Sequence, residues 1–423
     1  MKPHFTTKSS YPWIVILLCA AFLFYKYVLQ VSPSIMTNQL MREFHINATG
    51  LGNLAATFFY AYFITQLFVG VILDKFCLRT ICAVALAISG VGALVFAHAD
   101  NLLMACIARA MMGFGAAFAT VCYMKSAAVW FKPERFAFIG GLLATAAMLG
   151  AVFGEAPLAE VVHVSGWRDT LVLSGSIGIV IAVLFYALVR NAPRIGEVNQ
   201  ETYAITLKDV WSVLKKRQNW LLTFYSGLTF SPVAVFGGLW GNPFLHEDYG
   251  FSHVESASLI SLSFLGLAVG GPVLGWVSDC LGKRRSVMIF GNLLSLITLL
   301  IVIYGPVMQA WLLGTLLFLF GFGIGAFMLA FAMGKELNKL ALAATVIALI
   351  NTGDAIFGAF SEPLVGKLLD LQWAGKIVDG VHHFSVANYQ HAFLLLPAYI
   401  LVATGLLTQS PLQLVPVCLA PCP

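Results

Sequence analysis

Residues 275–284 read GWVSDCLGKR, a short polar and basic stretch between two long apolar runs. Residues 70–79 read GVILDKFCLR in the same setting, about 205 residues earlier in the chain. Two further pairs keep nearly the same spacing: GFG at 113–115 against GIG at 323–325, and PL at 157–158 against PL at 363–364. Three pairs at nearly one spacing predict that the chain contains two copies of one structural unit.

The composition indicates that these units lie in a membrane. Of the 423 residues, 60% are hydrophobic and 10% are charged, and the mean hydropathy is +0.88. A soluble domain carries about 25% charged residues, so this chain has too few charges to cover the soluble domains that its length would require. We therefore expect an all-α membrane protein.

Long apolar runs predict how the chain is organised. A helix needs about 20 apolar residues to cross the hydrocarbon core of a bilayer. Twelve such runs are found, at 12–33, 51–73, 79–98, 102–126, 136–159, 169–190, 220–245, 253–277, 286–305, 309–333, 340–366 and 392–409. The longest polar stretch follows the sixth run. This predicts two six-helix bundles, residues 1–190 and 220–409, with a cytoplasmic linker at 191–219 and a cytoplasmic tail at 410–423.

The positions of lysine and arginine predict the orientation, because basic residues gather in the cytoplasmic loops of membrane proteins. With the N-terminus in the cytoplasm, 17 of the 24 basic residues fall in cytoplasmic segments, and four fall on the opposite side: Arg42, Arg168, Lys367 and Lys376. We expect a multi-pass protein of a bacterial inner membrane with both termini in the cytoplasm. The net charge of +5 is then a topology signal, so nucleic acid is not an expected partner.

The two loops resemble the signature loop of the major facilitator superfamily, G-x-L-x-D-R/K-x-G-R/K-R/K. Residues 275–284 match at nearly every position, whereas 70–79 depart from it at Cys77 and Leu78. The stretch Arg109-Ala-Met-Met-Gly113-Phe-Gly115 resembles the helix-four motif of the same family. The resemblance covers the chain except for its last residues. It implies two pseudo-symmetric bundles around a central cavity, and a transporter rather than an enzyme.

The loop motif has a physical interpretation as a gate. Glycine lets two helices approach closely, the aspartate at a helix end can accept from an arginine, and the basic residues hold this end in the cytoplasm. In the family this cluster is thought to latch the cytoplasmic side. The predicted gate residues are Gly70, Asp74, Arg79, Gly275, Asp279, Lys283 and Arg284. A basic loop that only fixes topology is the alternative.

Ionisable side chains inside the predicted helices indicate a site, because each is costly to insert into a bilayer. Lys26, Arg109 and Asp354 each lie about 20 Å from the cytoplasmic side, at about 1.5 Å per residue. Glu155 also lies within a predicted helix, and Glu362 lies nearer a helix end. The alternative for Arg109 is a structural ion pair with Asp354 or Glu155.

Two cations in one cavity favour a solute with a carboxylate or phosphate. Aromatic and amide side chains near them suit a small organic molecule, so we predict a binding site made of Lys26, Arg109, Tyr25, Gln30, Tyr62, Tyr225 and Asn242. Asp354 and Glu155 are the predicted proton-coupling groups or counter-ions, since a carboxylate can trade its proton for a cationic partner.

These residues predict a secondary active transporter for a small anionic or zwitterionic solute: a sugar phosphate, dipeptide, amino acid or carboxylate. The resemblance extends to the branch of sugar-phosphate-permease-like carriers and lysosomal dipeptide transporters. We expect proton symport by a monomer, with the solute and the bilayer as partners and no obligate protein partner, cofactor or metal. No P-loop is present, which excludes an ATP-driven pump.

Two alternatives stay open. A drug or siderophore exporter of the same fold would be favoured by an antiporter motif in the fifth helix, where Glu155 stands in place of the usual proline. A transporter-like nutrient sensor would need a surface for a cytoplasmic partner.

Overall fold

The computed structural model describes residues 10–131, 135–190, 207–339, 342–378 and 380–409. It is almost entirely helical. The first half of the chain forms α1 (Tyr11–Val31), the 3-10 helix η1 (Ser32–Met36), α2 (Thr37–Glu43), α3 (Ala48–Lys75), α4 (Leu78–Ala97), α5 (Leu102–Ala116), α6 (Phe118–Trp130), α7 (Phe136–Ser165) and α8 (Trp167–Leu188).

The second half begins after α9 (Leu207–Lys215). It forms α10 (Arg217–Pro232), the π-helix η3 (Val233–Trp240), α11 (Gly241–Tyr249), α12 (His253–Leu281), α13 (Arg284–Tyr304), α14 (Ala310–Ile324), the 3-10 helix η4 (Gly325–Met328), α15 (Leu329–Glu336), α16 (Ala343–Leu371), α17 (Val386–Ala392) and α18 (Leu395–Gln409). Strands β1 (Ile377–Val378) and β2 (Val381–His382) pair as an antiparallel hairpin.

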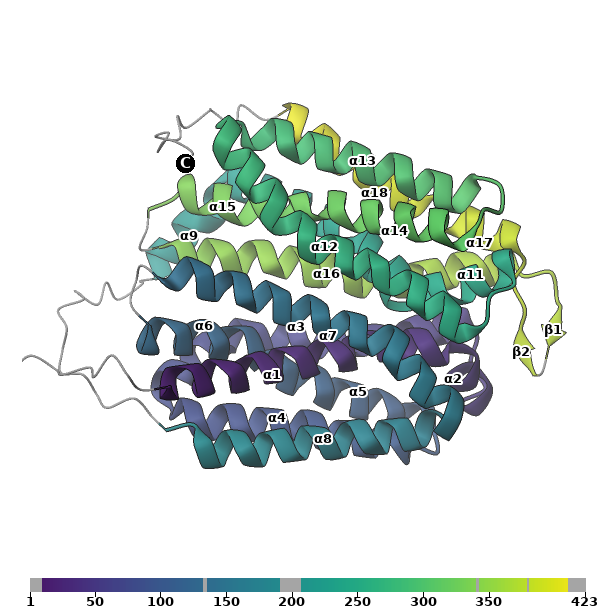
Figure 1. Ribbon diagram of the computed structural model, residues 1–423, viewed down its shortest axis with the longest axis horizontal. Helices are drawn as coiled ribbons and strands as arrows, with labels where there is room; N and C mark the ends of the chain where they lie inside the picture. The colour runs from purple at the N-terminus through teal and green to yellow at the C-terminus, as the bar shows by residue number, and fades with distance from the viewer. Residues whose placement is uncertain (1–9, 132–134, 191–206, 340–341, 379, 410–423) are drawn as a thin grey trace, which may run out of the picture.

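The long helices run side by side between two ends of the molecule (Figure 1). The start of α1 and the end of α18 lie at one end, which we call the terminal end. The β1–β2 hairpin, α2, α11 and α17 lie at the other, which we call the hairpin end. Helices α1–α8 gather on one side of the molecule and α10–α18 on the other.

Ten helical stretches in the described part of the chain are long and apolar enough to cross a membrane. Helices α3 and α16, of 28 and 29 residues, are not among these ten but lie against each other between the two halves. Large apolar side chains such as Leu103, Val183 and Trp276 are exposed on the outer helices. A helical protein embedded in a bilayer requires apolar side chains on its outer surface as well as in its interior.

Several predicted spans are interrupted rather than continuous. The span predicted at 12–33 ends as an α-helix at Val31 and continues as η1. Pro33 lies in this 3-10 segment, and a proline has no N–H with which to continue the helical ladder. The span predicted at 220–245 likewise contains the π-helix η3 after Pro232. Such interruptions free backbone carbonyls for other partners.

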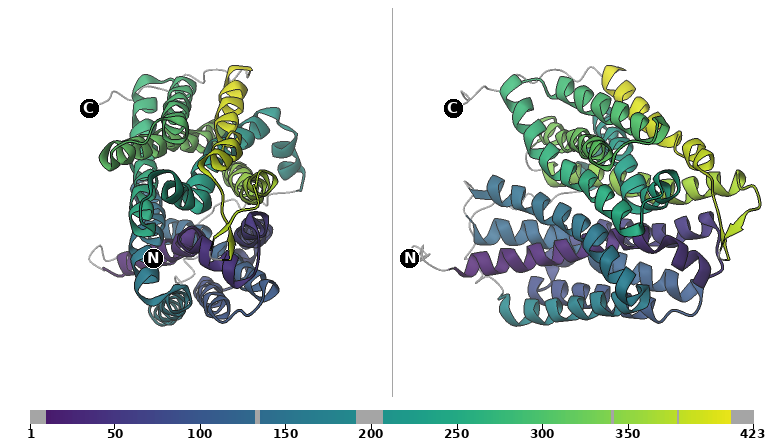
Figure 2. Two further views of the ribbon diagram at one scale, coloured as in Figure 1. Left: turned by 90° about the vertical axis from the view of Figure 1, so that its right-hand side faces the viewer. Right: turned by 45° about the vertical axis from the view of Figure 1, so that its right-hand side comes forward.

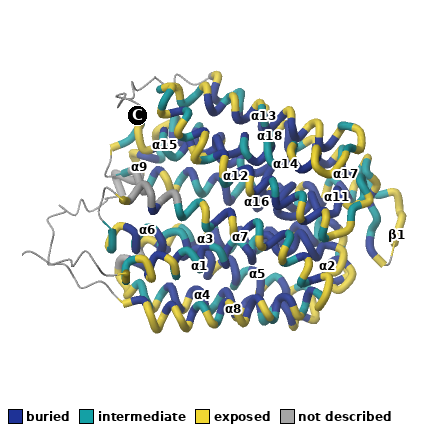
Figure 3. Tube along the Cα trace, in the orientation of Figure 1, coloured by how far each residue is buried: buried dark blue, intermediate teal, exposed yellow. Residues whose placement is uncertain are grey.

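The two halves pack together mainly toward the hairpin end. The main contacts between them are made by α3 with α16 and by α7 with α12. One apolar core joins the first half to the hairpin-end part of the second, whereas the terminal-end part of the second half has a separate core around Leu222, Met288 and Ile350. The helices of the two halves diverge toward the terminal end (Figure 2, right), and buried positions concentrate where the halves meet (Figure 3).

Candidate functional site

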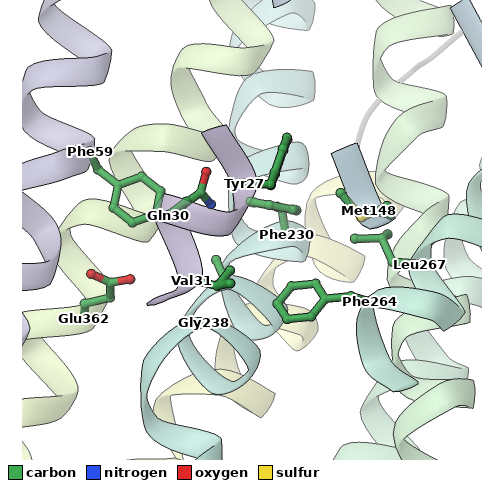
Figure 4. Close-up of a pocket in the computed structure, with 11 residues that line it drawn as sticks. Tyr27, Gln30, Val31, Phe59, Met148, Phe230, Gly238, Phe264, Leu267 and Glu362 are labelled. Carbon is green, nitrogen blue, oxygen red and sulfur yellow. The ribbon is translucent and has the colours of Figure 1, made fainter. Parts of the chain in front are cut away.

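A pocket lies between the two halves (Figure 4). Elements α1, α3 and α7 line it from the first half, and α10, η3, α12 and α16 line it from the second. Its lining residues are Tyr27, Gln30, Val31, Phe59, Met148, Phe230, Ala234, Gly238, Phe264, Leu267 and Glu362. The walls are thus mainly aromatic and aliphatic, with one phenol, one amide and one carboxylate among them. A few polar groups in an apolar pocket are typical of sites for small molecules.

Glu362 supplies the carboxylate of the pocket lining. It is 3% exposed, and its Oε2 atom has no hydrogen-bond partner in the described part of the chain. Its backbone oxygen accepts a hydrogen bond of 3.1 Å from the indole of Trp240. The sequence placed this residue near a helix end because the predicted span stopped at residue 366. In the structure α16 continues to Leu371, which puts Glu362 well inside the helix.

Lys26 lies next to the pocket on α1 and is 5% exposed. Its Nζ atom lies 3.6 Å from the ring centroid of Tyr27 and 5.0 Å from that of Tyr62. No carboxylate among the described residues pairs with it; the rings hold its charge by cation–π attraction. The structure therefore brings together Lys26 and Tyr62, two predicted site residues. It leaves the amine available to an anionic group.

Asp354 is buried on α16 and accepts a hydrogen bond of 2.6 Å from the hydroxyl of Ser226 on α10. It lies near Tyr27 and Tyr62, so it belongs to the same region as Lys26 without forming an ion pair with it. Tyr62 also lies beside Asn351 of α16. Aromatic groups of the first half and polar groups of α16 thus meet at this level.

Arg109 is fully buried between α1, α3 and α5. Its guanidinium donates to the backbone oxygens of Leu29 at 2.7 Å, Gln30 at 3.5 Å and Ala55 at 3.4 Å. The Leu29 carbonyl is the group that Pro33 leaves without its helical N–H partner. The Ser32 hydroxyl also donates to this oxygen, at 3.0 Å, so Arg109 and Ser32 together replace the missing helical hydrogen bond of α1. Arg109 does not line the pocket.

Glu155 connects the two halves near the hairpin end. One of its oxygens accepts a hydrogen bond of 2.6 Å from Ser34 of η1, and the other accepts one of 2.7 Å from the Asn242 amide of α11. All three residues are buried. The structure thus unites Glu155 and Asn242, which the sequence had assigned to separate roles, in one polar contact between the halves.

The remaining predicted binding residues take different positions. Gln30 lines the pocket. The Tyr25 ring packs against Gly178 on α8, and its hydroxyl has no partner in the described part of the chain. The Tyr225 hydroxyl bonds Asn292 of α13 at 3.5 Å. Tyr25 and Tyr225 therefore point into their own halves rather than into the pocket.

The two loop motifs lie at the terminal end. In the second copy, Arg284 pairs with Asp279 at 2.5 Å and with Glu336 at 2.7 Å. Lys283 is exposed, and Gly282 ends α12 with a positive φ of 61°. In the first copy, the Arg79 Nε atom donates to the Tyr186 carbonyl at 2.5 Å. The side chain of Asp74 lies outside the described residues.

The close helix approach that we expected at Gly70 and Gly275 is not found. A Cβ atom added at either glycine would have no neighbour within 4 Å. The reason is that the halves diverge at this end. The close approaches lie at the hairpin end instead, where a Cβ atom added at Gly52 would lie 2.6 Å from the backbone oxygen of Glu362.

The model of the Major Facilitator Superfamily matches residues 14–362 and 228–413. The chain is 26% identical over 311 residues to the hexuronate transporter of Bacillus subtilis, covering 70% of this chain and 71% of that protein. It is 23% identical over 390 residues to the membrane sensor protein UhpC of Escherichia coli, covering 86% of each. The chain also matches two further bacterial transporters, of which it spans 66% and 59% of the length.

Solved structures share the fold. A bacterial homologue of the human lysosomal transporter Spinster, in an inward-facing and unoccupied conformation, superposes with a TM-score of 0.78 at 13% sequence identity. The superposition covers 96% of this chain and 97% of that structure.

Proposed function

Since this chain belongs to the Major Facilitator Superfamily, we propose that it is a secondary active transporter that moves a small anionic or zwitterionic organic solute by alternating access. Membership places the chain among transporter-type membrane proteins and not among enzymes. The observation that carries the proposal is the buried Lys26 amine, which lies beside an aromatic pocket between the halves and has no carboxylate partner among the residues that the structure describes. An unpaired buried cation is costly and suits an anionic ligand. The relatives whose names include hexuronate and L-galactonate agree with such a solute.

The proposed architecture is twelve spans in two bundles, residues 1–190 and 220–409, joined by the cytoplasmic linker 191–219 and followed by the tail 410–423. The ten apolar stretches, together with α3 and α16, support this number. We place both termini in the cytoplasm of a bacterium and the chain in its inner membrane as a monomer. The terminal end is then the cytoplasmic end.

The proposed energy source is the proton gradient. Asp354 accepts a single hydrogen bond from Ser226 and lies in the region of Lys26, so it can take up a proton when the lysine engages the solute. Glu155 accepts hydrogen bonds from Ser34 of its own half and from Asn242 of the opposite half. We propose that its protonation weakens this contact and so links proton uptake to the opening of the hairpin end. Arg109 is proposed to support the site by holding the interrupted part of α1 on which Gln30 lies.

The experiment is uptake into proteoliposomes that contain the purified full chain. Hexuronates, sugar phosphates, dipeptides and dicarboxylates are tested with and without an inward proton gradient. We expect gradient-driven accumulation of at least one anionic or zwitterionic solute, lost in Lys26→Met and partly kept in Lys26→Arg. Lys367→Met, at an exposed lysine of α16, is the matched control. Accumulation by Lys26→Met at the rate of the unaltered chain would remove Lys26 from the site.

A second candidate function is a membrane sensor, because the relative UhpC carries that name and aligns over 86% of both chains. A sensor binds its solute without moving it at a useful rate. Solute binding to the purified chain, together with no uptake under any gradient, would favour the sensor over the transporter.

A further inference from the structure

We propose that the solute bound in this pocket carries an ammonium group as well as a carboxylate, with Glu362 receiving the ammonium and Lys26 the carboxylate. The inference rests on the proposed function, because it names the class of solute for the same site. Hexuronate and L-galactonate, the solutes in the names of two relatives, are acids without an amine. The inference therefore gives this chain a different class of solute from the ones in those names.

The first step concerns Glu362. Its side chain is almost fully buried and lines the pocket beside Phe59 and Gln30 (Figure 4). The described part of the chain provides no hydrogen-bond donor to Oε2, and no ion pair with a lysine or arginine. The guanidinium of Arg109 acts on it only at a distance, since its hydrogen bonds go to backbone oxygens. A buried carboxylate without a donor is costly and therefore suits a cationic ligand group.

The second step concerns the other carboxylates between the halves. Glu155 has a donor on each of its two oxygens. Asp354 has a donor from Ser226. Glu362 lies eight residues beyond Asp354 on α16, which is about 12 Å toward the hairpin end. Of these three acids, Glu362 is the one that lines the pocket and lacks a donor, so it is the one an ammonium would meet.

The third step concerns the opposite charge. Lys26 lies one helical turn before Gln30, a residue of the pocket lining. Its amine lies over the faces of Tyr27 and Tyr62, and no carboxylate among the described residues pairs with it. A cation and an anion that have no direct ion-pair partner among the described residues therefore approach the same pocket from α1 and α16. A single solute with both charges would satisfy the two of them together, whereas a simple acid would leave Glu362 without a direct hydrogen-bond or ion-pair partner.

The fourth step concerns the space between these charges. Phe59, Phe230 and Phe264 line the pocket from α3, α10 and α12. Ring faces attract ammonium groups and also accept an aliphatic backbone. These walls suit the carbon skeleton of an amino acid, a dipeptide or an amino sugar acid, with one charged group at each end.

The test uses pairs of solutes that differ only in the amine. One pair is L-alanyl-L-alanine and N-acetyl-L-alanyl-L-alanine; the other is 2-amino-2-deoxy-D-gluconate and D-gluconate. Binding to the purified full chain is measured by the shift of its thermal unfolding midpoint, since a ligand of the folded state raises it. Uptake into proteoliposomes is measured in parallel. We expect the amine-bearing member of at least one pair to bind at least 10-fold more tightly, and Glu362→Gln to remove this preference.

Glu160→Gln, at an exposed position of α7, is the matched control and should keep the preference. Glu362→Asp serves if the glutamine variant does not fold; it should reduce the preference without abolishing it. Equal binding of both members, or a preference that survives Glu362→Gln, overturns the inference and leaves an acid transporter standing. One further outcome overturns the inference: Glu362→Gln loses proton-driven accumulation but still exchanges both solutes of a pair by counterflow. Glu362 would then carry the proton and not bind the ammonium. Failure of every solute in both the binding and the uptake assays contradicts the proposed function itself.

Discussion

The hairpin end and the terminal end of the molecule differ in how the two halves meet. At the hairpin end, polar contacts join the halves: Asn242 to Glu155, the Ala156 amide to Ser261 at 3.3 Å, and residues 48–49 to Asp370. At the terminal end, the described contacts of Arg79 and Arg284 stay within one half each. The apolar cores are continuous across the halves at the first end and separate at the second.

This difference indicates that the molecule is in a state closed at the hairpin end. Each hydrogen bond contributes about 0.5–1.5 kcal/mol net, so opening this end gives up several such contributions. Two states that exchange during transport must be within a few kcal/mol of each other. Contacts that form at the terminal end when it closes must therefore offset this loss. Gly70 and Gly275, which have free space around them here, are positions where such contacts can form.

The largest expected effect comes from placing a side chain at the closed contact. In Gly52→Val, the added Cβ would lie 2.6 Å from the Glu362 oxygen and the Pro363 Cα atom, both of which are backbone atoms of the opposite half. The halves must separate there. We expect the hairpin-closed state to lose about 3 kcal/mol, which shifts the equilibrium by roughly 100-fold toward the open state.

The measurement is the distance between spin labels at Asn38 on α2 and Ala387 on α17, two exposed positions of opposite halves at the hairpin end. Gly405→Val is the control, because a Cβ atom there meets nothing within 4 Å. If the label distance is unchanged in Gly52→Val, the contact at Gly52 does not hold this end closed.

The second effect tests the polar contact of Glu155. In Glu155→Ala, the Ser34 hydroxyl and the Asn242 amide lose their acceptor in a buried place. We expect this to cost the closed state about 2 kcal/mol. A double-mutant cycle with Asn242→Ala, read from the same label distance, should give a coupling of about 1–3 kcal/mol. Glu160→Ala on the same helix is the control. Additive effects of the two substitutions would mean that the Asn242 bond contributes nothing across the halves.

The sequence was informative about which residues are charged and buried, and less so about what they face. Lys26, Arg109, Glu155 and Asp354 are all buried, as their positions in apolar runs predicted. A membrane helix is apolar on its lipid face and on its packed face, so hydrophobic periodicity does not indicate which way a side chain points. This is why Tyr25 and Tyr225, predicted at the site, point into their own halves.

Helix interruptions explain the other differences. The position of Arg109 is related to the break at Pro33, because the arginine, together with the Ser32 hydroxyl, bonds the Leu29 carbonyl that the break leaves without a helical N–H partner. Glu362 was set aside because its predicted helix ended too early; the structure extends α16 to Leu371. The sequence did contain a signal for Glu362, because this acid stands directly before Pro363. A proline within a membrane helix frees backbone groups, which are often found at sites. The Ala359 carbonyl, four residues before Pro363, indeed accepts from the Tyr60 hydroxyl of the opposite half.

The third effect concerns Asp370, which closes the hairpin end from the second half. Its carboxylate accepts from the amides of Ala48 and Thr49 and from the Thr49 hydroxyl, at the first turn of α3. Asp370→Ala should cost about 1 kcal/mol, as loss of a helix N-cap does, because the site is partly exposed. Hydrogen exchange of the Thr49 amide is the measurement. Asp370→Asn should retain part of its protection, and exchange as slow as in the unaltered chain would show that Asp370 does not protect this turn.

The smallest effect compares the two loop copies at the terminal end. Arg284 bridges Asp279 and Glu336, whereas Arg79 bonds the carbonyl of Tyr186. Lysine cannot reproduce a forked guanidinium contact with two carboxylates, so Arg284→Lys should cost about 0.5–1 kcal/mol of stability and Arg79→Lys about 0–0.5.

Thermal unfolding at low and high salt separates the two loop copies, because salt screens a partly exposed ion pair more than a hydrogen bond to a carbonyl. The loss in Arg284→Lys should therefore shrink with salt, and that in Arg79→Lys should not. Neither variant should change the label distance between residues 38 and 387, since both arginines act within one half in this state. If either variant changes this label distance, the contacts at the terminal end already affect the hairpin end in the closed state. The two ends would then not be independent of each other.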